Sequence, residues 1–310
     1  MIPLSSVVAM SVQNPPARHH YVPVFYLKQW AAQDGRLIEF SRPYGKKIVA
    51  QSVFPKESGF EWQLYSTDGV PHEDRHKIET EVMKPLDNDA AKALDRLYGH
   101  DTLWPEDERA GWSKFVFSLL TRGPEDIALL KDQLAKDYLT FIPELEQWYG
   151  SVREEHYPPT LVDFLNAERS ELFGPFVQDI LGSIFRGGEA QEWISGLDWA
   201  VIASDESRFE FITSDRPVIK TATLRKVGDY IILPIGPRRA FVGITDRRTK
   251  AILLRDGVGK LVKSINKTVA QQATKYIYAS DESQRQFVEN NMGRGKSPSL
   301  VRQMIASDRA

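Results

Sequence analysis

The sequence contains no cysteine in 310 residues, so disulfides, thiolate metal sites and a cysteine nucleophile are all excluded. It has no stretch approaching the roughly 20 apolar residues that span a bilayer. The first ten residues lack the basic start and long apolar stretch of a signal peptide. We therefore expect a cytoplasmic protein without a membrane partner. A phosphate-binding glycine loop, a nucleophile elbow and a dinucleotide fingerprint are also missing.

Net charge is low over the whole chain, at −2, but the charges are unevenly distributed. Residues 216–267 hold thirteen Lys or Arg against three acidic residues, which leaves the remainder acidic. Such segregation is typical of a face that meets phosphates, although strands also carry Lys and Arg on their solvent side. Segment 216–267 is accordingly the predicted contact surface for a nucleic-acid partner.

The hydrophobic pattern predicts an α+β fold. Helical spacing dominates the middle of the chain, at 76–98 with a kink at Pro85, from Pro105, from Pro124 to 149, at 161–171 and at 175–185. A further helix is expected at 264–274. Short runs separated by turn signals predict a mainly antiparallel sheet from both ends of the chain, with strands at 37–40, 47–50, 199–203, 209–213, 230–233, 240–244 and 276–278. We expect one domain over 18–290 between flexible tails at 1–17 and 291–310.

Two of the six histidines, His19 and His20, stand side by side before an apolar aromatic run. A buried imidazole has two ring nitrogens that need partners. Because successive side chains alternate in an extended segment, one histidine would face a cleft while the other holds the loop. The one in the cleft would serve as a general base or a metal ligand. The alternative is a pair of structural histidines bonded to backbone carbonyls.

A second motif, Thr213-Ser214-Asp215-Arg216-Pro217, follows an apolar run directly. A carboxylate at a strand end can bind a metal or orient an imidazole. Proline holds the preceding arginine extended, so that its planar fork could clamp a phosphate. The alternative is a plain Ser or Asx turn before a proline.

A third pattern places His72 and His76 around Glu73, the spacing of zinc proteases. Pro71 puts the pattern at or before a helix start, which favours a solvated, acidic first turn instead. Glu79, a little farther along, is a candidate partner of the histidines.

These residues carry a resemblance to a family. The His19-His20-Tyr21-Val22-Pro23 start, the Thr-Ser-Asp motif with Val218, and the looser Arg122-Gly123-Pro124 step resemble the prokaryotic domain of unknown function 4238. The resemblance extends from His19 to about Ala279. It implies no settled activity.

The leading hypothesis is a nuclease-like phosphodiester hydrolase, an effector of bacterial defence or conflict. Its candidate catalytic residues are His19, His20, Asp215, Arg216 and Glu79, and its candidate substrate-binding residues are Arg18, Tyr21, Ser214, Arg238 and Asn266. A divalent metal, Mg²⁺ or Mn²⁺, is the cofactor that such chemistry would use. One alternative is a non-catalytic module that binds nucleic acid or protein. Another is a zinc hydrolase that uses His72 and His76.

Overall fold

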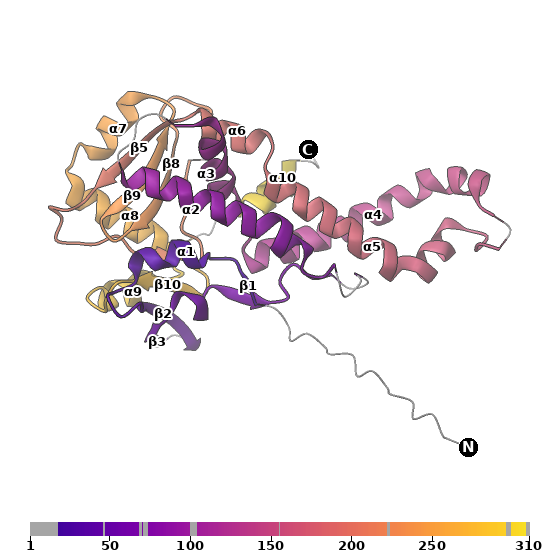
Figure 1. Ribbon diagram of the computed structural model, residues 1–310, viewed down its shortest axis with the longest axis horizontal. Coiled ribbons are helices and arrows are strands. Elements are labelled where there is room, and N and C mark those ends of the chain that lie inside the picture. Colours follow the sequence, from indigo (N-terminus) through magenta and orange to yellow (C-terminus); the bar gives the residue numbers. More distant parts are fainter. Residues whose placement is uncertain are drawn as a thin grey trace, which may run out of the picture.

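The computed structural model describes residues 18–45, 47–67, 70, 74–99, 104–154, 156–221, 224–295 and 299–307. Within these residues the α+β prediction is confirmed. Two four-stranded antiparallel sheets lie together, and a pair of long helices extends away from them (Figure 1). In the same ranges, no helix is both long enough and apolar enough to cross a membrane.

The C-terminal sheet has helices on both faces. Along one strand, Ile231 and Leu233 join the core beneath α2, α3 and α6, while Ile232 joins the core beneath α8. This is the alternation that a strand imposes on successive side chains. The sheet has the order β5 (Asp198–Ala203), β9 (Arg239–Ile244), β8 (Tyr230–Gly236), β7 (Ile219–Lys220). Its helices are α2 (Lys84–Tyr98), α3 (Glu106–Leu119), α6 (Glu189–Gly196), α7 (Arg247–Leu254) and α8 (Val258–Gln272).

The second sheet joins the two ends of the chain. Ile277 pairs with Phe40 on one side and with Ser214 on the other. The Tyr26 hydroxyl donates to the carbonyl of Pro234 at 2.6 Å and lies 2.7 Å from Thr213 Oγ1. The N-terminal motif is therefore fastened to the Thr-Ser-Asp motif. This sheet has the order β3 (Lys47–Val53), β2 (Leu37–Tyr44), β10 (Tyr276–Ala279), β6 (Thr213–Ser214). The helix α1 (Val24–Leu27) and the 3₁₀ turn η1 (Lys28–Trp30) lie in sequence between β1 (Arg18–His20) and β2.

The projecting helices are α4 (Pro124–Val152) and α5 (Leu161–Arg186), which form an antiparallel pair (Figure 1). Pro124 opens α4 as predicted. Two separate helices at 161–171 and 175–185 were expected, and this is wrong, because α5 continues through Pro175. Proline removes one backbone hydrogen bond. The buried Val177 and Leu181 follow at helical spacing and hold the next turns against the core.

Two further expectations are corrected. The strand expected at 209–213 shrinks to β6, because the Ile212 N–H donates to the Asn266 side chain instead of to a neighbouring strand. Beyond α9 (Arg285–Asn291), the expected flexible tail at 291–310 contains α10 (Leu300–Ser307), whose Val301 is fully buried. The tail expected at 1–17 lies outside the described residues.

Candidate functional site

The histidine pair lies on a short strand, β1 (Arg18–His20), which pairs with β4 (Phe60–Trp62). The side chains alternate as predicted. Arg18 and His20 lie against the ring of Phe60, at 4.7 and 5.7 Å, whereas His19 is completely buried. Just before β4, Gly59 accepts the two backbone N–H groups that follow His20. A Cβ at Gly59 would lie 2.8 Å from the Val22 side chain, so only glycine fits there.

His19 is held as a neutral imidazole. Its Nδ1 accepts the backbone N–H of Tyr65 at 3.2 Å, which leaves the ring proton on Nε2. The ring stacks on Tyr65 at 5.2 Å and meets His76 edge-on at 5.8 Å. Burial, together with the charges of His76 and Lys131, lowers the pKa of His19 to about 4. At neutral pH, His19 therefore presents an N–H donor.

Glu79 lies in a π-helical turn, η3 (Ile78–Met83), directly before α2. Such turns are rare in proteins overall, and those that do occur are frequently at functional sites. Burial and the nearby Asp87 raise the pKa of Glu79 to about 7, against the opposing effect of Arg122. The carboxyl group is therefore balanced between its acid and base forms near neutral pH, which suits proton transfer.

Arg122 follows α3 and is fully buried. Its Nη1 donates to Asp87 Oδ1 at 3.0 Å. Its Nε and Nη2 have no hydrogen-bond partner among the described residues. These two nitrogens form one edge of the guanidinium, and their N–H bonds match two oxygens of a phosphate or carboxylate.

We call this group the buried polar cluster; its members are His19, Tyr65, His76, Glu79, Asp87 and Arg122. Buried polar atoms are almost always hydrogen-bonded. Within the described part of the chain, this cluster concentrates the exceptions, at His19 Nε2, the Tyr65 hydroxyl, His76 Nδ1, Glu79 Oε2, and Arg122 Nε and Nη2. The cluster is therefore the candidate site.

Only part of the cluster was predicted from sequence. His19, His76 and Glu79 were candidates, whereas Tyr65, Asp87 and Arg122 were not. The signal for Arg122 was present in the Arg-Gly-Pro step after an apolar helix, where a charged side chain has no obvious solvent-facing position. Nothing in the sequence singled out Tyr65 from the other aromatic residues of its loop.

Replacing Glu79 with glutamine is expected to change stability in a pH-dependent way. Between pH 4.5 and about 7 the folded protein keeps a proton on Glu79 that the unfolded chain has released. The contribution of Glu79 to the free energy of unfolding therefore falls as pH rises through this window. In urea unfolding, the free energy of unfolding of Glu79→Gln minus that of wild type should be larger at pH 8 than at pH 5. The exposed Glu81→Gln is the control. An equal difference at both pH values for Glu79→Gln would contradict the assignment.

Asp215 is used differently from the prediction. Its carboxylate accepts the backbone N–H of Thr274 at 3.0 Å, the Thr274 hydroxyl at 2.6 Å and the backbone N–H of Lys275 at 2.5 Å. Burial raises its pKa, and these hydrogen bonds oppose the rise. No hydrogen bond joins Asp215 to either histidine among the described residues. The expected orientation of an imidazole by Asp215 is therefore corrected: the carboxylate fixes the connection between α8 and β10.

Arg216 is also held by partners. Its Nη2 lies 3.0 Å from Asp126 Oδ2 and 3.2 Å from Glu125 Oε2. Its backbone N–H donates to Ser214 Oγ at 3.1 Å, which matches the Ser turn weighed as the alternative for this motif. Because Glu125 and Asp126 already neutralise the guanidinium, this side of Arg216 has a structural role.

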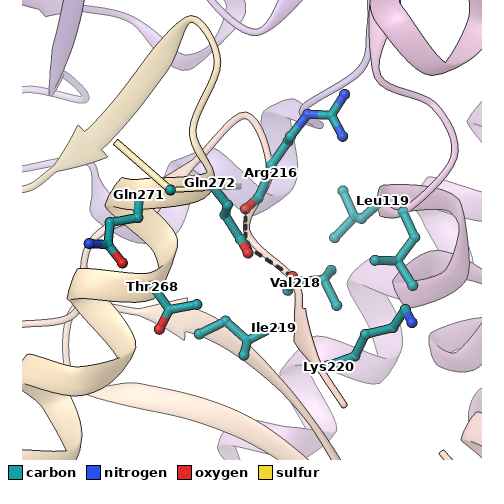
Figure 2. Close-up of a pocket in the computed structure, with 10 residues that line it drawn as sticks. Leu119, Arg216, Val218, Ile219, Lys220, Thr268, Gln271 and Gln272 are labelled. Carbon is teal, nitrogen blue, oxygen red and sulfur yellow. Dashed lines mark hydrogen bonds between the residues drawn. The ribbon is translucent and has the colours of Figure 1, made fainter. Parts of the chain in front are cut away.

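On its other side Arg216 borders a cavity of about 210 Å³ (Figure 2). The Gln272 amide bridges the carbonyls of Arg216 and Val218 on the cavity wall. Lys220 lines the same cavity, and burial lowers its pKa. The remaining lining is largely apolar, from Leu119, Leu120 and Ile219, with Thr268, Gln271 and Gly295.

The other candidate residues lie away from the buried polar cluster, and two of them, Arg238 and Asn266, line one hollow. Arg238 forms an ion pair with Glu210 at 3.1 Å, and Asn266 holds the backbone of residues 210 and 212. Tyr21 is buried near Asp215, and burial raises its pKa. His72 lies outside the described residues. Among the residues that are described, no three His, Asp or Glu side chains are placed to hold one metal ion.

Comparison with known proteins agrees with the resemblance seen in the motifs. A family model for a protein of unknown function, DUF4238, matches residues 18–283. No curated protein and no solved structure matches the chain. The match includes the strands β2 and β10, which pair in the second sheet, and every residue of the buried polar cluster. The chain therefore belongs to the family described as protein of unknown function (DUF4238).

Proposed function

We propose that the protein is a nuclease-like phosphodiester hydrolase and that its catalytic groups belong to the buried polar cluster. The observation that supports this most directly is the pairing of chemistries around Glu79. A carboxyl group with a pKa of about 7 lies in the same electrostatic environment as the unpartnered donor edge of Arg122. Phosphodiester hydrolysis needs both a proton acceptor and a group that binds the phosphate oxygens.

In this proposal Glu79 accepts the proton of the attacking water or ribose hydroxyl. Arg122 donates Nε and Nη2 to two non-bridging phosphate oxygens, with Asp87 fixing the guanidinium through Nη1. His19 remains neutral and donates Nε2–H to the charge that develops on the phosphate. The bond from phosphorus to the leaving oxygen breaks, and this oxygen takes up a proton from solvent water. His76 and Glu79 are half-buried and so lie nearer the surface than the enclosed Arg122 and His19. The phosphate therefore has to enter the cluster to reach these two enclosed residues.

The test is incubation of purified protein with single-stranded and double-stranded DNA and RNA, in EDTA and with added Mg²⁺ or Mn²⁺. Wild-type protein should cleave at least one substrate. Glu79→Gln should lower the rate by about 100-fold or more, the usual contribution of a general base. The rate should increase with pH through about 7, as Glu79 loses its proton.

The matched control is Glu81→Gln, which changes an exposed carboxylate in the same π-helical turn. It should cleave at the wild-type rate. As an effector of bacterial conflict, wild type should also stop growth when expressed in a bacterial host, whereas Glu79→Gln should not. Cleavage that is equally fast in wild type and Glu79→Gln would overturn the proposal. Binding of nucleic acid without cleavage in any condition would select the non-catalytic binding module instead.

A further inference from the structure

A second feature lies away from the buried polar cluster, where Phe209 borders two adjoining hollows of about 470 and 390 Å³. Both hollows also share Arg208 and Lys263. The larger is lined in addition by Glu210, Arg238, Asn266, Lys267, Asp281, Ser283, Gln284 and Phe287, and the smaller by Glu206, Ser207, Val258, Gly259 and Lys260.

The positive charge of these hollows comes largely from one face of α8. Lys260, Lys263 and Lys267 follow one another at intervals of three and four residues, so they share a side of the helix. Like charges at this spacing destabilise a helix. None of the three, nor Arg208, forms an ion pair with a carboxylate in the described ranges. This arrangement gives four cations without local neutralisation.

The acidic residues of the lining are partly occupied by other groups. Glu210 pairs with Arg238 at 3.1 Å, and Asp281 accepts the backbone N–H of Ser283 at 2.9 Å. Glu206 is exposed at the rim. Cations therefore dominate the interior, as in a surface that meets a polyanion.

The segment that carries Phe209 is rigidly placed. Its backbone N–H donates to Ser207 Oγ at 3.1 Å. The next carbonyl, of Glu210, accepts from Asn266 at 2.8 Å and from Gln284 at 3.0 Å. A half-buried aromatic ring is thus fixed between the hollows before any ligand binds.

We propose that this pair of hollows binds single-stranded nucleic acid, with phosphates along Lys260, Lys263 and Lys267 and an unpaired base on Phe209. In the free protein Lys263 Nζ lies over the Phe209 ring, 4.5 Å from its centre. Such an exposed cation–π contact is weaker than the stacking of a base on an aromatic ring. A base therefore displaces the ammonium, which is then available to a phosphate.

The recessed position of the ring selects for a single strand. In a duplex the faces of the bases are covered by their stacked neighbours, so a base cannot enter a hollow without being extruded. In a single strand the base is free to enter at little cost. This site goes beyond the proposed hydrolase, because it is made of other residues and would remain if the buried polar cluster were inert.

The test measures binding of labelled oligonucleotides by fluorescence anisotropy in EDTA over a range of salt concentrations, with intact strand confirmed on a gel. Single-stranded oligonucleotide should bind more tightly than a duplex of the same sequence. Phe209→Leu, which keeps an apolar side chain, should weaken binding about tenfold. The double variant Lys263→Gln/Lys267→Gln should reduce the slope of log K against log salt by about 1.4, because each lost phosphate contact contributes about 0.7.

The control is Lys250→Gln on α7, an exposed lysine outside both hollows, which should leave affinity nearly unchanged. The site would be overturned if Lys250→Gln weakened binding as much as Lys263→Gln or Lys267→Gln does alone. Equal affinity for duplex, or a nucleoside monophosphate that binds as tightly as the strand, would also overturn it. All measurements are repeated in Glu79→Gln protein. If single strands do not bind to the Glu79→Gln protein, the nucleic-acid site is overturned, whereas the hydrolase proposal is still decided by the cleavage assay alone.

Discussion

Replacing Asp215 with alanine is expected to lower the free energy of unfolding by about 3 kcal/mol or more. The carboxylate is 5% exposed and accepts three hydrogen bonds from the segment that joins α8 to β10. Alanine would leave the donors of Thr274 and Lys275 buried without an acceptor, and each such donor costs about 1–3 kcal/mol. Urea unfolding measures the change directly.

The comparison variant for this prediction is Asp205→Ala. Like Asp215, Asp205 accepts hydrogen bonds; its donor is Arg239, at 2.8 Å. Its side chain, however, is 61% exposed. Exposed ion pairs contribute little to stability, so this variant should leave the free energy of unfolding nearly unchanged. Asp215→Asn, which keeps one acceptor oxygen, should fall between the two. An Asp215→Ala protein as stable as wild type but unable to cleave nucleic acid would return Asp215 to the catalytic role predicted from sequence.

Much of the architecture could be predicted from hydrophobic periodicity. The strands β8 and β9 and the second half of the helix α8 follow from alternating and helical spacing, because each presents one apolar face to a layer of the fold, whereas the first turns of α8, from Val258, lie outside the helix predicted at 264–274. The failures occur where tertiary contacts override local signals. Pro175 usually ends a helix, yet burial of the following turns carries α5 through it. The apolar run before Thr213 looks like a strand, yet Asn266 takes its backbone hydrogen bond.

The candidate site was harder to predict for a physical reason. A sequence motif shows which side chains have the chemistry for catalysis or binding, but not which of them are already hydrogen-bonded or ion-paired within the fold. Asp215 and Arg216 stand in the more conspicuous motif, and the fold gives hydrogen-bond donors to the Asp215 carboxylate and acidic partners to Arg216 Nη2, although Arg216 Nε has no partner among the described residues. Arg122 stands in a weak motif, and the fold leaves two of its nitrogens without a partner. The difference depends on contacts between residues far apart in sequence.

Arg122→Met is expected to lower the free energy of unfolding by about 3–5 kcal/mol. Methionine keeps most of the apolar stem but removes the partner of Asp87. Burial raises the pKa of Asp87, and the charge and hydrogen bond of Arg122 oppose this rise. The Asp87 side chain is only 24% exposed, so without its arginine it must either stay charged at a cost or take up a proton. Equilibrium unfolding in urea at pH 7 gives the size of the loss.

The double variant Asp87→Leu/Arg122→Met separates stability from function. Replacing both members of a buried ion pair with apolar side chains is often close to neutral, so most of the lost stability should return. If Arg122 binds the phosphate, the double variant should still cleave nucleic acid at least about 100-fold more slowly than wild type. A stable double variant with wild-type cleavage would show that Arg122 serves the fold alone. A phosphate-binding role for Arg122 explains why two donors of a fully buried arginine remain without protein partners in the described part of the chain.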